Sequence, residues 1–167
     1  VVSPEHAMVK QWLDKGILKN ADAVKAYQAE AARKSDFERS ELNKEKTGVR
    51  LEGVMGINPV NDTEIPIFIS DYVLSTYGTG AIMAVPGGDQ RDYDFAVKFG
   101  LPVIYTVKPL PESGDDLANY EGKAPFVSHD GIVINSSIDA TKAKGDSLSL
   151  DGLRVDAVAS MLYLDYS

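Results

Sequence analysis

The sequence changes its pattern at Gly48, and this change constrains the fold more than any other feature. Before Gly48, apolar residues recur at the spacing of amphipathic helices, whereas after it short β-rich runs alternate with turns. Helices followed by mixed strands and helices indicate an α+β fold or a mixed barrel. The 167 residues suffice for one domain with a hydrophobic core.

The part before Gly48 predicts three helices. Ser3 is the expected N-cap of the first, and Asn20 is the expected cap of an Ala-rich second helix. Ser35 with Glu38 forms a capping-box pattern that opens a third helix, which we expect to stop near Gly48.

The part after Gly48 predicts a β-rich region. Two β-rich runs joined by "NDT" are typical of a hairpin. A polar loop rich in Pro and Gly covers residues 108–125, and a helix over 150–164 is expected to close the chain. The expected strands lie near 53–60, 64–74, 79–85, 102–107 and 131–135, with a helix from about 90 to 99.

The composition excludes several chemistries and partners. The chain has no cysteine, which excludes a disulfide framework and a thiol nucleophile, and the spacing of His6 and His129 predicts no metal site. No apolar run approaches the roughly 20 residues of a membrane span. The net charge of −8 is unlike a free-standing nucleic-acid binder, so another part of a longer protein would have to hold any polynucleotide.

The run "GTGAIMA", Gly78 to Ala84, matches the spacing of a dinucleotide-binding fingerprint. That fingerprint needs a helix after it, whereas the following residues have a strand pattern that ends at Pro86. A glycine turn that leads into a buried strand is therefore the favoured interpretation.

The run "MAVPGGDQRDYDF", residues 83–95, places three aspartates and an arginine directly after an apolar stretch. In a structural interpretation, Asp89 is the N-cap of a helix and Asp92 favours the positive end of its dipole. In a functional one, the glycines let a ligand approach the helix N-terminus, where a carboxylate would bind an ammonium group. The residues by themselves leave both interpretations open.

The longer run "YGTGAIMAVPGGDQRDYDFA", Tyr77 to Ala96, resembles the signature of the editing domain of bacterial-type leucyl-tRNA synthetases. The resemblance extends from Thr47 to about Ser137, and the flanking helices agree more loosely. The resemblance implies the inserted domain called connective polypeptide 1, a mixed β-barrel with surrounding helices. It also implies hydrolysis of tRNA(Leu) charged with a wrong amino acid such as norvaline, because a methylene-sized difference gives a synthetic pocket weak discrimination.

The same resemblance implies the partners and the site. The partners would be the tRNA(Leu) 3′ end and the rest of a cytoplasmic synthetase, with no membrane. Editing would need no cofactor, and ATP and Mg would serve the activation domain of the parent enzyme. Asp92 matches the aspartate that anchors the substrate α-amino group, and it is predicted to be catalytic together with Asp89. The predicted substrate-binding residues are Tyr77, Met83, Val85, Arg91 and Asp92.

The sequence departs from that family in two places. Gly88 stands where histidine is usual, and the family's threonine-rich segment, which positions the water, is not in this sequence. We therefore expect a single editing domain over residues 1–167, cut from a longer synthetase that includes that segment, with weak or no hydrolytic activity in isolation. The alternatives are a fragment that binds tRNA ends or amino-acid adenylates without catalysis, and a stand-alone small-molecule-binding α+β protein.

Overall fold

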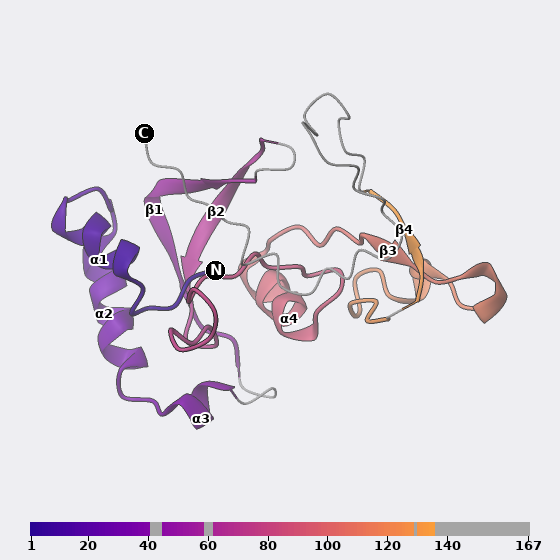
Figure 1. Cartoon of the computed structure of the whole chain (residues 1–167), viewed down its shortest axis with the longest axis horizontal. Helices are drawn as coiled ribbons and strands as arrows, with labels where there is room; N and C mark the ends of the chain where they lie inside the picture. The colour runs from indigo at the N-terminus through magenta and orange to yellow at the C-terminus, as the bar shows by residue number, and fades with distance from the viewer. Residues whose placement is uncertain (41–44, 59–61, 129, 136–167) are drawn as a thin grey trace. The chain divides into compact units, whose positions relative to one another are not determined.

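The computed structural model describes residues 1–40, 45–58, 62–128 and 130–135. The chain divides into two compact units, of which unit 1 takes in Val1–Met83 and unit 2 begins at Ala84. Figure 1 shows the helices and the strand pair of unit 1 in indigo to magenta, and unit 2 in pink to orange. Each unit is described by itself.

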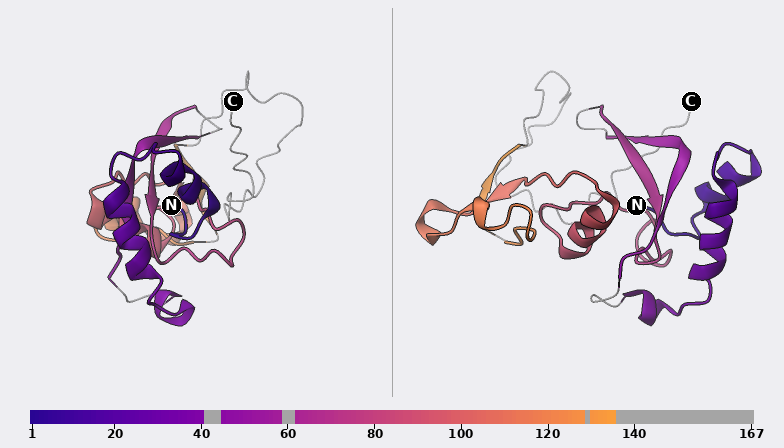
Figure 2. Two further views of the ribbon diagram at one scale, coloured as in Figure 1. Left: turned by 90° about the vertical axis from the view of Figure 1, so that its left-hand side faces the viewer. Right: turned by 180° about the vertical axis from the view of Figure 1, so that it is seen from behind.

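Unit 1 is a helical layer on a strand pair. Its elements are α1 (Ala7–Asp14), α2 (Ala21–Ala31), α3 (Asp36–Ser40), β1 (Val49–Ile57) and β2 (Glu64–Ile69). The two strands pair antiparallel, which confirms the predicted hairpin around "NDT". Figure 2 shows α1 and α2 beside this strand pair in its right-hand view.

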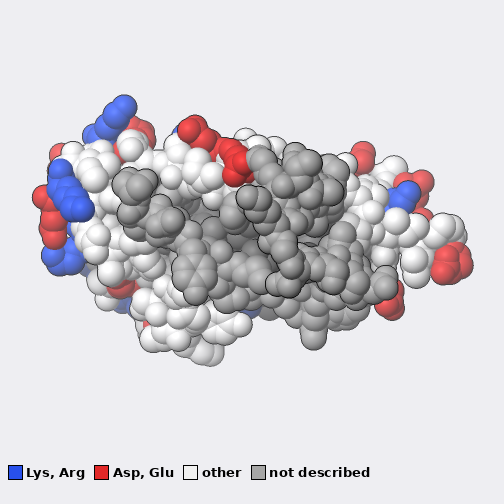
Figure 3. All heavy atoms as spheres, turned by 45° about the horizontal axis from the view of Figure 1, so that its top comes forward, with Lys and Arg blue, Asp and Glu red and all other residues white. Residues whose placement is uncertain are grey.

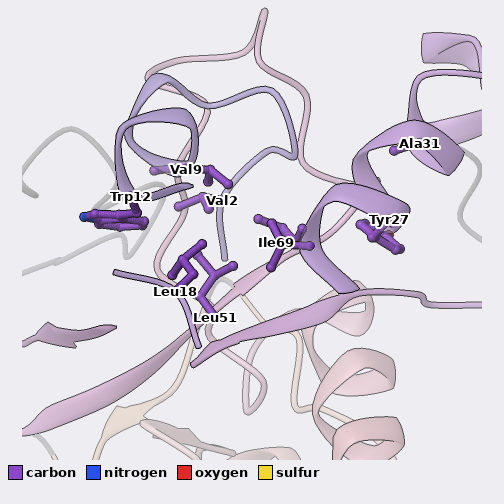
Figure 4. Close-up of a cluster of buried hydrophobic side chains, with 10 residues drawn as sticks. Val2, Val9, Trp12, Leu18, Tyr27, Ala31, Leu51 and Ile69 are labelled. Carbon is purple, nitrogen blue, oxygen red and sulfur yellow. The ribbon is translucent and has the colours of Figure 1, made fainter. Parts of the chain in front are cut away.

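The hydrophobic core of unit 1 lies where α1 and α2 face the strand pair (Figure 4). Full burial of a valine, leucine or isoleucine side chain contributes roughly 1.5–3 kcal/mol to folding, so this cluster holds the helices against the strands. Its most deeply buried members, at 0% or 1% exposure, are Val9, Val24, Ala31, Leu51 and Ile69.

The first helix begins later than the sequence predicts. Its N-cap is His6, whose Nδ1 accepts the Met8 N–H at 3.2 Å. Ser3 lies before the helix, where its N–H donates to the Gly80 carbonyl at 2.8 Å and its Oγ accepts the Glu5 N–H at 3.2 Å. The prediction of Ser3 as the cap is wrong because a tertiary contact, which local spacing does not reveal, engages this residue.

The next two helices begin where the sequence predicts. Asn20 is the N-cap position of α2, but its side chain bonds to β1 instead: Nδ2 donates to the Arg50 carbonyl at 2.7 Å and Oδ1 accepts the Glu52 N–H at 3.1 Å. Ser35 and Glu38 form the predicted capping box, since the Ser35 N–H donates to Glu38 Oε2 at 2.7 Å and the Glu38 N–H donates to Ser35 Oγ at 3.3 Å.

Four predictions for this part of the chain are wrong. The first strand, expected near 53–60, is β1 at Val49–Ile57 and therefore begins earlier. Residues 45–48 are not helical, and β2 ends at Ile69 rather than near residue 74. The expected strand 79–85 is reduced to a bridge between Ala81 and Val2. The preceding Gly78 and Gly80 adopt left-handed φ angles of 57° and 71°, so the chain turns there, and no helix follows as a dinucleotide fingerprint requires.

The described part of unit 2 contains α4 (Gln90–Phe99), the strands β3 (Val107–Lys108) and β4 (Ile132–Val133), and two 3-10 turns, Pro111–Ser113 and Leu117–Asn119. The helix predicted from about 90 to 99 and the loop over 108–125 are confirmed. The last two predicted strands are much shorter than expected. The helix predicted over 150–164 lies outside the described residues.

The fold class α+β is confirmed. Within the described ranges, the strands form two separate two-stranded antiparallel sheets, β1–β2 and β3–β4, rather than a closed barrel. The helices of those ranges are all too short or too polar to cross a membrane.

Candidate functional site

Asp89 is the N-cap of α4, as the sequence predicts. Its Oδ1 accepts the N–H of Arg91 at 2.8 Å and of Asp92 at 3.0 Å, which satisfies two of the helix's orphan donors. A cap of this kind stabilises a helix by about 1 kcal/mol. Gly100 ends the helix with a left-handed φ of 62°, also as predicted.

The side chain of Asp92 is nearly buried, with 5% exposure, in the first turn of α4. Its Oδ2 accepts the backbone N–H of Val85 at 2.8 Å. A buried carboxylate is costly unless hydrogen bonds and nearby positive charge compensate it, and here the Val85 amide and the helix N-terminus do so. Asp92 is therefore tied to the backbone that precedes its own helix.

The backbone from Val85 to Asp89 closes into a turn, which we call the 85–89 turn. The carbonyl of Val85 accepts the N–H of Gly88 at 2.9 Å and of Asp89 at 3.1 Å. Because the Val85 N–H donates to Asp92, both backbone polar groups of Val85 are engaged. The turn and the first turn of α4 thus form one hydrogen-bonded arrangement.

The two glycines in this turn have different surroundings. A Cβ at Gly87 would lie 2.3 Å from the carbonyl oxygen of Ile104, so no larger residue fits without a backbone shift. A Cβ at Gly88 would meet no atom within 4 Å. The position that is usually histidine in the family therefore has room for a side chain to begin.

The predicted site residues fall in both units. Unit 2 brings Val85, Asp89, Arg91 and Asp92 together through the 85–89 turn and the start of α4, with Arg91 exposed. Unit 1 contains Tyr77 and Met83. The side chain of Tyr77 is 74% exposed, beyond the end of β2, and Met83 is half-buried.

Two features of this region do not follow from the sequence motif. Spacing alone does not show that Asp92 bonds to Val85 across seven positions, or that Gly87 packs against a backbone nearly twenty residues later. The glycine pair itself is the sequence signal for the packing of Gly87. It indicates that the backbone approaches another group closely, but it does not identify that group.

The arrangement can bind a cation through a charge-assisted hydrogen bond, since Asp92 is an acceptor-only carboxylate when ionised. The described residues contain no group of three or more His, Asp or Glu side chains that could hold a metal ion. On the face drawn in Figure 3, Lys and Arg side chains are interspersed with Asp and Glu over the helical region at the left, so that region presents mixed rather than uniform charge.

A second polar cluster lies in unit 1, around Asp71, which is 2% exposed. Its Oδ2 accepts from the Lys34 Nζ at 2.9 Å, and its N–H donates to the Tyr27 hydroxyl at 3.0 Å. Its carbonyl accepts from Arg39 Nε at 2.8 Å, and Arg39 also binds Glu5 through both terminal nitrogens, at 2.9 and 3.2 Å. The cluster joins α2 and α3 to the segment after β2, and we regard it as structural.

Comparisons with known proteins extend this description. The family model described as "Leucyl-tRNA synthetase, editing domain" matches residues 1–148. A leucine–tRNA ligase of Bifidobacterium adolescentis is 66% identical over 93% of this chain and 17% of the relative. A leucine–tRNA ligase of Alkaliphilus oremlandii is 48% identical over 81% of this chain and 16% of the relative. This chain thus spans less than a fifth of the length of these relatives.

One solved structure resembles the fold over most of the chain. It is a crystal structure of the ternary complex of Agrobacterium radiobacter K84 agnB2 LeuRS, tRNA and LeuAMS, with 32% sequence identity and a TM-score of 0.51. The similarity covers 71% of this chain and 14% of that one.

Proposed function

This chain belongs to the leucyl-tRNA synthetase editing-domain family, and from that premise we propose that it hydrolyses the ester bond of tRNA(Leu) charged with a wrong amino acid. The observation that carries the proposal is the nearly buried carboxylate of Asp92 at the N-terminus of α4, inside the matched segment. It is the kind of group that can fix the direction of an aminoacyl ester's ammonium group.

We propose that Asp92 anchors the α-ammonium group while its Oδ2 keeps the 85–89 turn in place. Asp89 holds the start of α4, and the side chain of Arg91, the second residue of that helix, is exposed to solvent. In the reaction, a water oxygen adds to the ester carbonyl carbon, the bond from that carbon to the ribose oxygen breaks, and a proton from the water passes to the ribose oxygen, which leaves the free amino acid and the ribose hydroxyl. Holding the water close to the ester carbonyl carbon and in the correct orientation supplies much of the rate enhancement.

The remaining site residues keep the roles that the sequence resemblance implies for them, as proposals. Val85 would line the site around the terminal adenosine and the amino-acid side chain, and its backbone is held at both polar groups. Tyr77 and Met83 would contact the terminal adenosine and the side chain of the mischarged amino acid. The large exposed fraction of Tyr77 is compatible with a stacking role.

The proposal extends to the whole protein. We propose that the chain is a single editing domain of a leucyl-tRNA synthetase, in which ATP and Mg²⁺ serve activation elsewhere and the domain forms part of a mixed β-barrel. The tRNA(Leu) 3′ end would be the partner, in the cytoplasm. With a net charge of −8, the chain itself gives little electrostatic attraction for a polyanion, so the rest of the synthetase would bind most of the tRNA.

The test is deacylation of norvalyl-tRNA(Leu) by the full-length synthetase that we propose carries this domain, with leucyl-tRNA(Leu) as the matched substrate. We expect the norvalyl ester to be hydrolysed much faster than the leucyl ester. Hydrolysis of the norvalyl ester at the uncatalysed rate, with tight binding retained, would support a binding-only domain and contradict the proposal.

A further inference from the structure

The backbone at Gly87 lies directly against the segment that leads into β3. A Cβ at Gly87 would be 2.3 Å from the Ile104 oxygen and 2.8 Å from Tyr105 Cα. Both neighbours are backbone atoms, which cannot swing aside as the end of a flexible side chain can. Any residue other than glycine must therefore separate the two main chains at this point.

The backbone that Gly87 meets is itself held in place. Tyr105 is 7% exposed, and its hydroxyl lies 2.9 Å from the Tyr120 carbonyl and 2.8 Å from the Ala124 carbonyl, to which it donates. The N–H of Phe126 donates to the Gly87 carbonyl at 3.0 Å. Gly87 is thus fixed by a steric contact on one side and a backbone hydrogen bond on the other.

A displacement of the backbone at Gly87 would also move Val85 and Asp89, which lie two positions away on either side and belong to the candidate site. Gly87 lies in the middle of the 85–89 turn, between Val85, which donates to Asp92, and Asp89, which caps α4. Because both ends of the turn are hydrogen-bonded to the first turn of α4, the turn cannot move outward without altering the position of the Asp92 carboxylate.

We infer that Gly87 is a positioning residue for the editing reaction: it sets how closely the 85–89 turn approaches the backbone of residues 104–105, and thereby where the Asp92 carboxylate lies. The inference rests on the proposed function of this site. Gly87 touches no reacting atom in this account. It acts through the turn, and small misplacements of a reacting group can reduce a rate on the order of 100-fold.

The experiment compares Gly87→Ala with Gly88→Ala in the full-length synthetase. Hydrogen–deuterium exchange of the peptide covering residues 85–92 reports the turn, and steady-state deacylation of norvalyl-tRNA(Leu) reports the reaction. For Gly87→Ala we expect faster exchange in that peptide and a kcat reduced on the order of 100-fold, with KM and leucylation retained. Gly88→Ala adds a Cβ that would have no atom within 4 Å, so it should leave the exchange of this peptide unchanged.

A second variant keeps the inference testable if Gly87→Ala fails to fold. Tyr105→Phe removes the hydroxyl that holds the facing backbone, so it should lower kcat in the same direction by a smaller factor. A folded Gly87→Ala protein with parental kcat, or one whose exchange matches that of the parent, would overturn the inference. If the unaltered protein itself does not deacylate, the proposed function fails, while the exchange comparison still decides whether Gly87 fixes the turn.

Discussion

The carboxylate of Asp92 accepts the backbone N–H of Val85 at 2.8 Å, so the acid at the start of α4 holds the 85–89 turn that leads into that helix. The bond gives Asp92 a structural task in addition to the anchoring role that we propose. A carboxylate has two oxygens and about four lone-pair sites, so one side chain can serve a backbone donor and an ammonium group at once.

We predict that Asp92→Ala and Asp92→Asn separate these two tasks. Both lose the charge that would bind the substrate ammonium, which should cost about 1.5–3 kcal/mol, or roughly ten- to a hundredfold in deacylation of norvalyl-tRNA(Leu). Asparagine keeps an acceptor oxygen for the Val85 N–H, so only alanine should also lower the melting temperature markedly. Leucine activation by the full-length synthetase, which we propose takes place in another domain, serves as the control.

The opposite result would show that Asp92 is only a structural residue. Such a residue would give an alanine variant that melts lower yet edits at the parental rate per folded molecule, and an asparagine variant that resembles the parent in both measurements. The site assignment would then be withdrawn, and the hydrogen bond to Val85 would explain the residue by itself.

A second prediction concerns Arg39, which is 6% exposed and donates to the carbonyls of Asp71 and Val73 as well as to Glu5. Arg39→Ala leaves the carbonyls of the buried residues Asp71 and Val73 without this donor, so we expect a loss of about 2–3 kcal/mol in the free energy of unfolding of the 167-residue chain. Urea denaturation measures it.

The matched control for Arg39 is Lys10→Ala, which breaks the exposed ion pair with Asp14 at 2.6 Å. Surface pairs at this helical spacing contribute only about 0.3–0.5 kcal/mol, so the control should unfold almost like the parent. An equal loss of unfolding free energy in the two variants would show that the buried Arg39 interactions contribute no more to stability than an exposed ion pair does.

The third prediction concerns the stability of unit 1 at high pH. Burial by itself would lower the pKa of Lys34, but hydrogen bonds and charge interactions with Asp71 and Glu30 outweigh it and raise the pKa well above the usual value of 10.5. A raised folded-state pKa contributes stability that is fully present below the unfolded pKa and is lost as the pH rises through the folded one. Burial likewise raises the pKa of the neighbouring Tyr27 hydroxyl, so its ionisation acts in the same direction.

The measurement is thermal unfolding of the parent and of Lys34→Met from neutral pH to above about pH 10.5. The parent should be the more stable at neutral pH, and the difference should shrink as the pH rises past that value. Because Tyr27 titrates in both proteins, the difference isolates Lys34. A difference that stays constant across this range would contradict the role of the Lys34–Asp71 pair.

Local chemistry predicted the capped helix better than the strands. Asp89 and Gly100 mark the ends of α4 because a side-chain cap and a left-handed glycine act within a few residues, and the capping box at Ser35 works in the same way. Strand 79–85 did not form as predicted, and β3 and β4 are short, because pairing depends on a partner far along the chain. Spacing cannot supply that partner.

The same distinction applies to the candidate site. The position of Asp92 at a helix N-terminus is a local feature that the sequence predicted, whereas its role in the site came from the resemblance to the editing-domain signature. The contact of Gly87 with Ile104 and the bond from Phe126 depend on where a later segment returns, which the sequence does not encode at short range. Both contacts therefore follow from the three-dimensional structure of unit 2 and not from the local sequence.

The last prediction uses Gly88, which stands at the position that is usually histidine in the family. A Cβ there meets no atom within 4 Å and the φ angle lies outside the left-handed range, so a side chain strains nothing in the folded state. It also removes freedom from the unfolded chain, so Gly88→Ala should stabilise the protein by about 0.4–1 kcal/mol. Gly87→Ala, one position earlier, should destabilise it, since its Cβ would lie 2.3 Å from the Ile104 oxygen. Chemical denaturation of the two variants decides the matter: opposite signs are expected, and a destabilised Gly88→Ala would show that the open space beside this residue is occupied in solution.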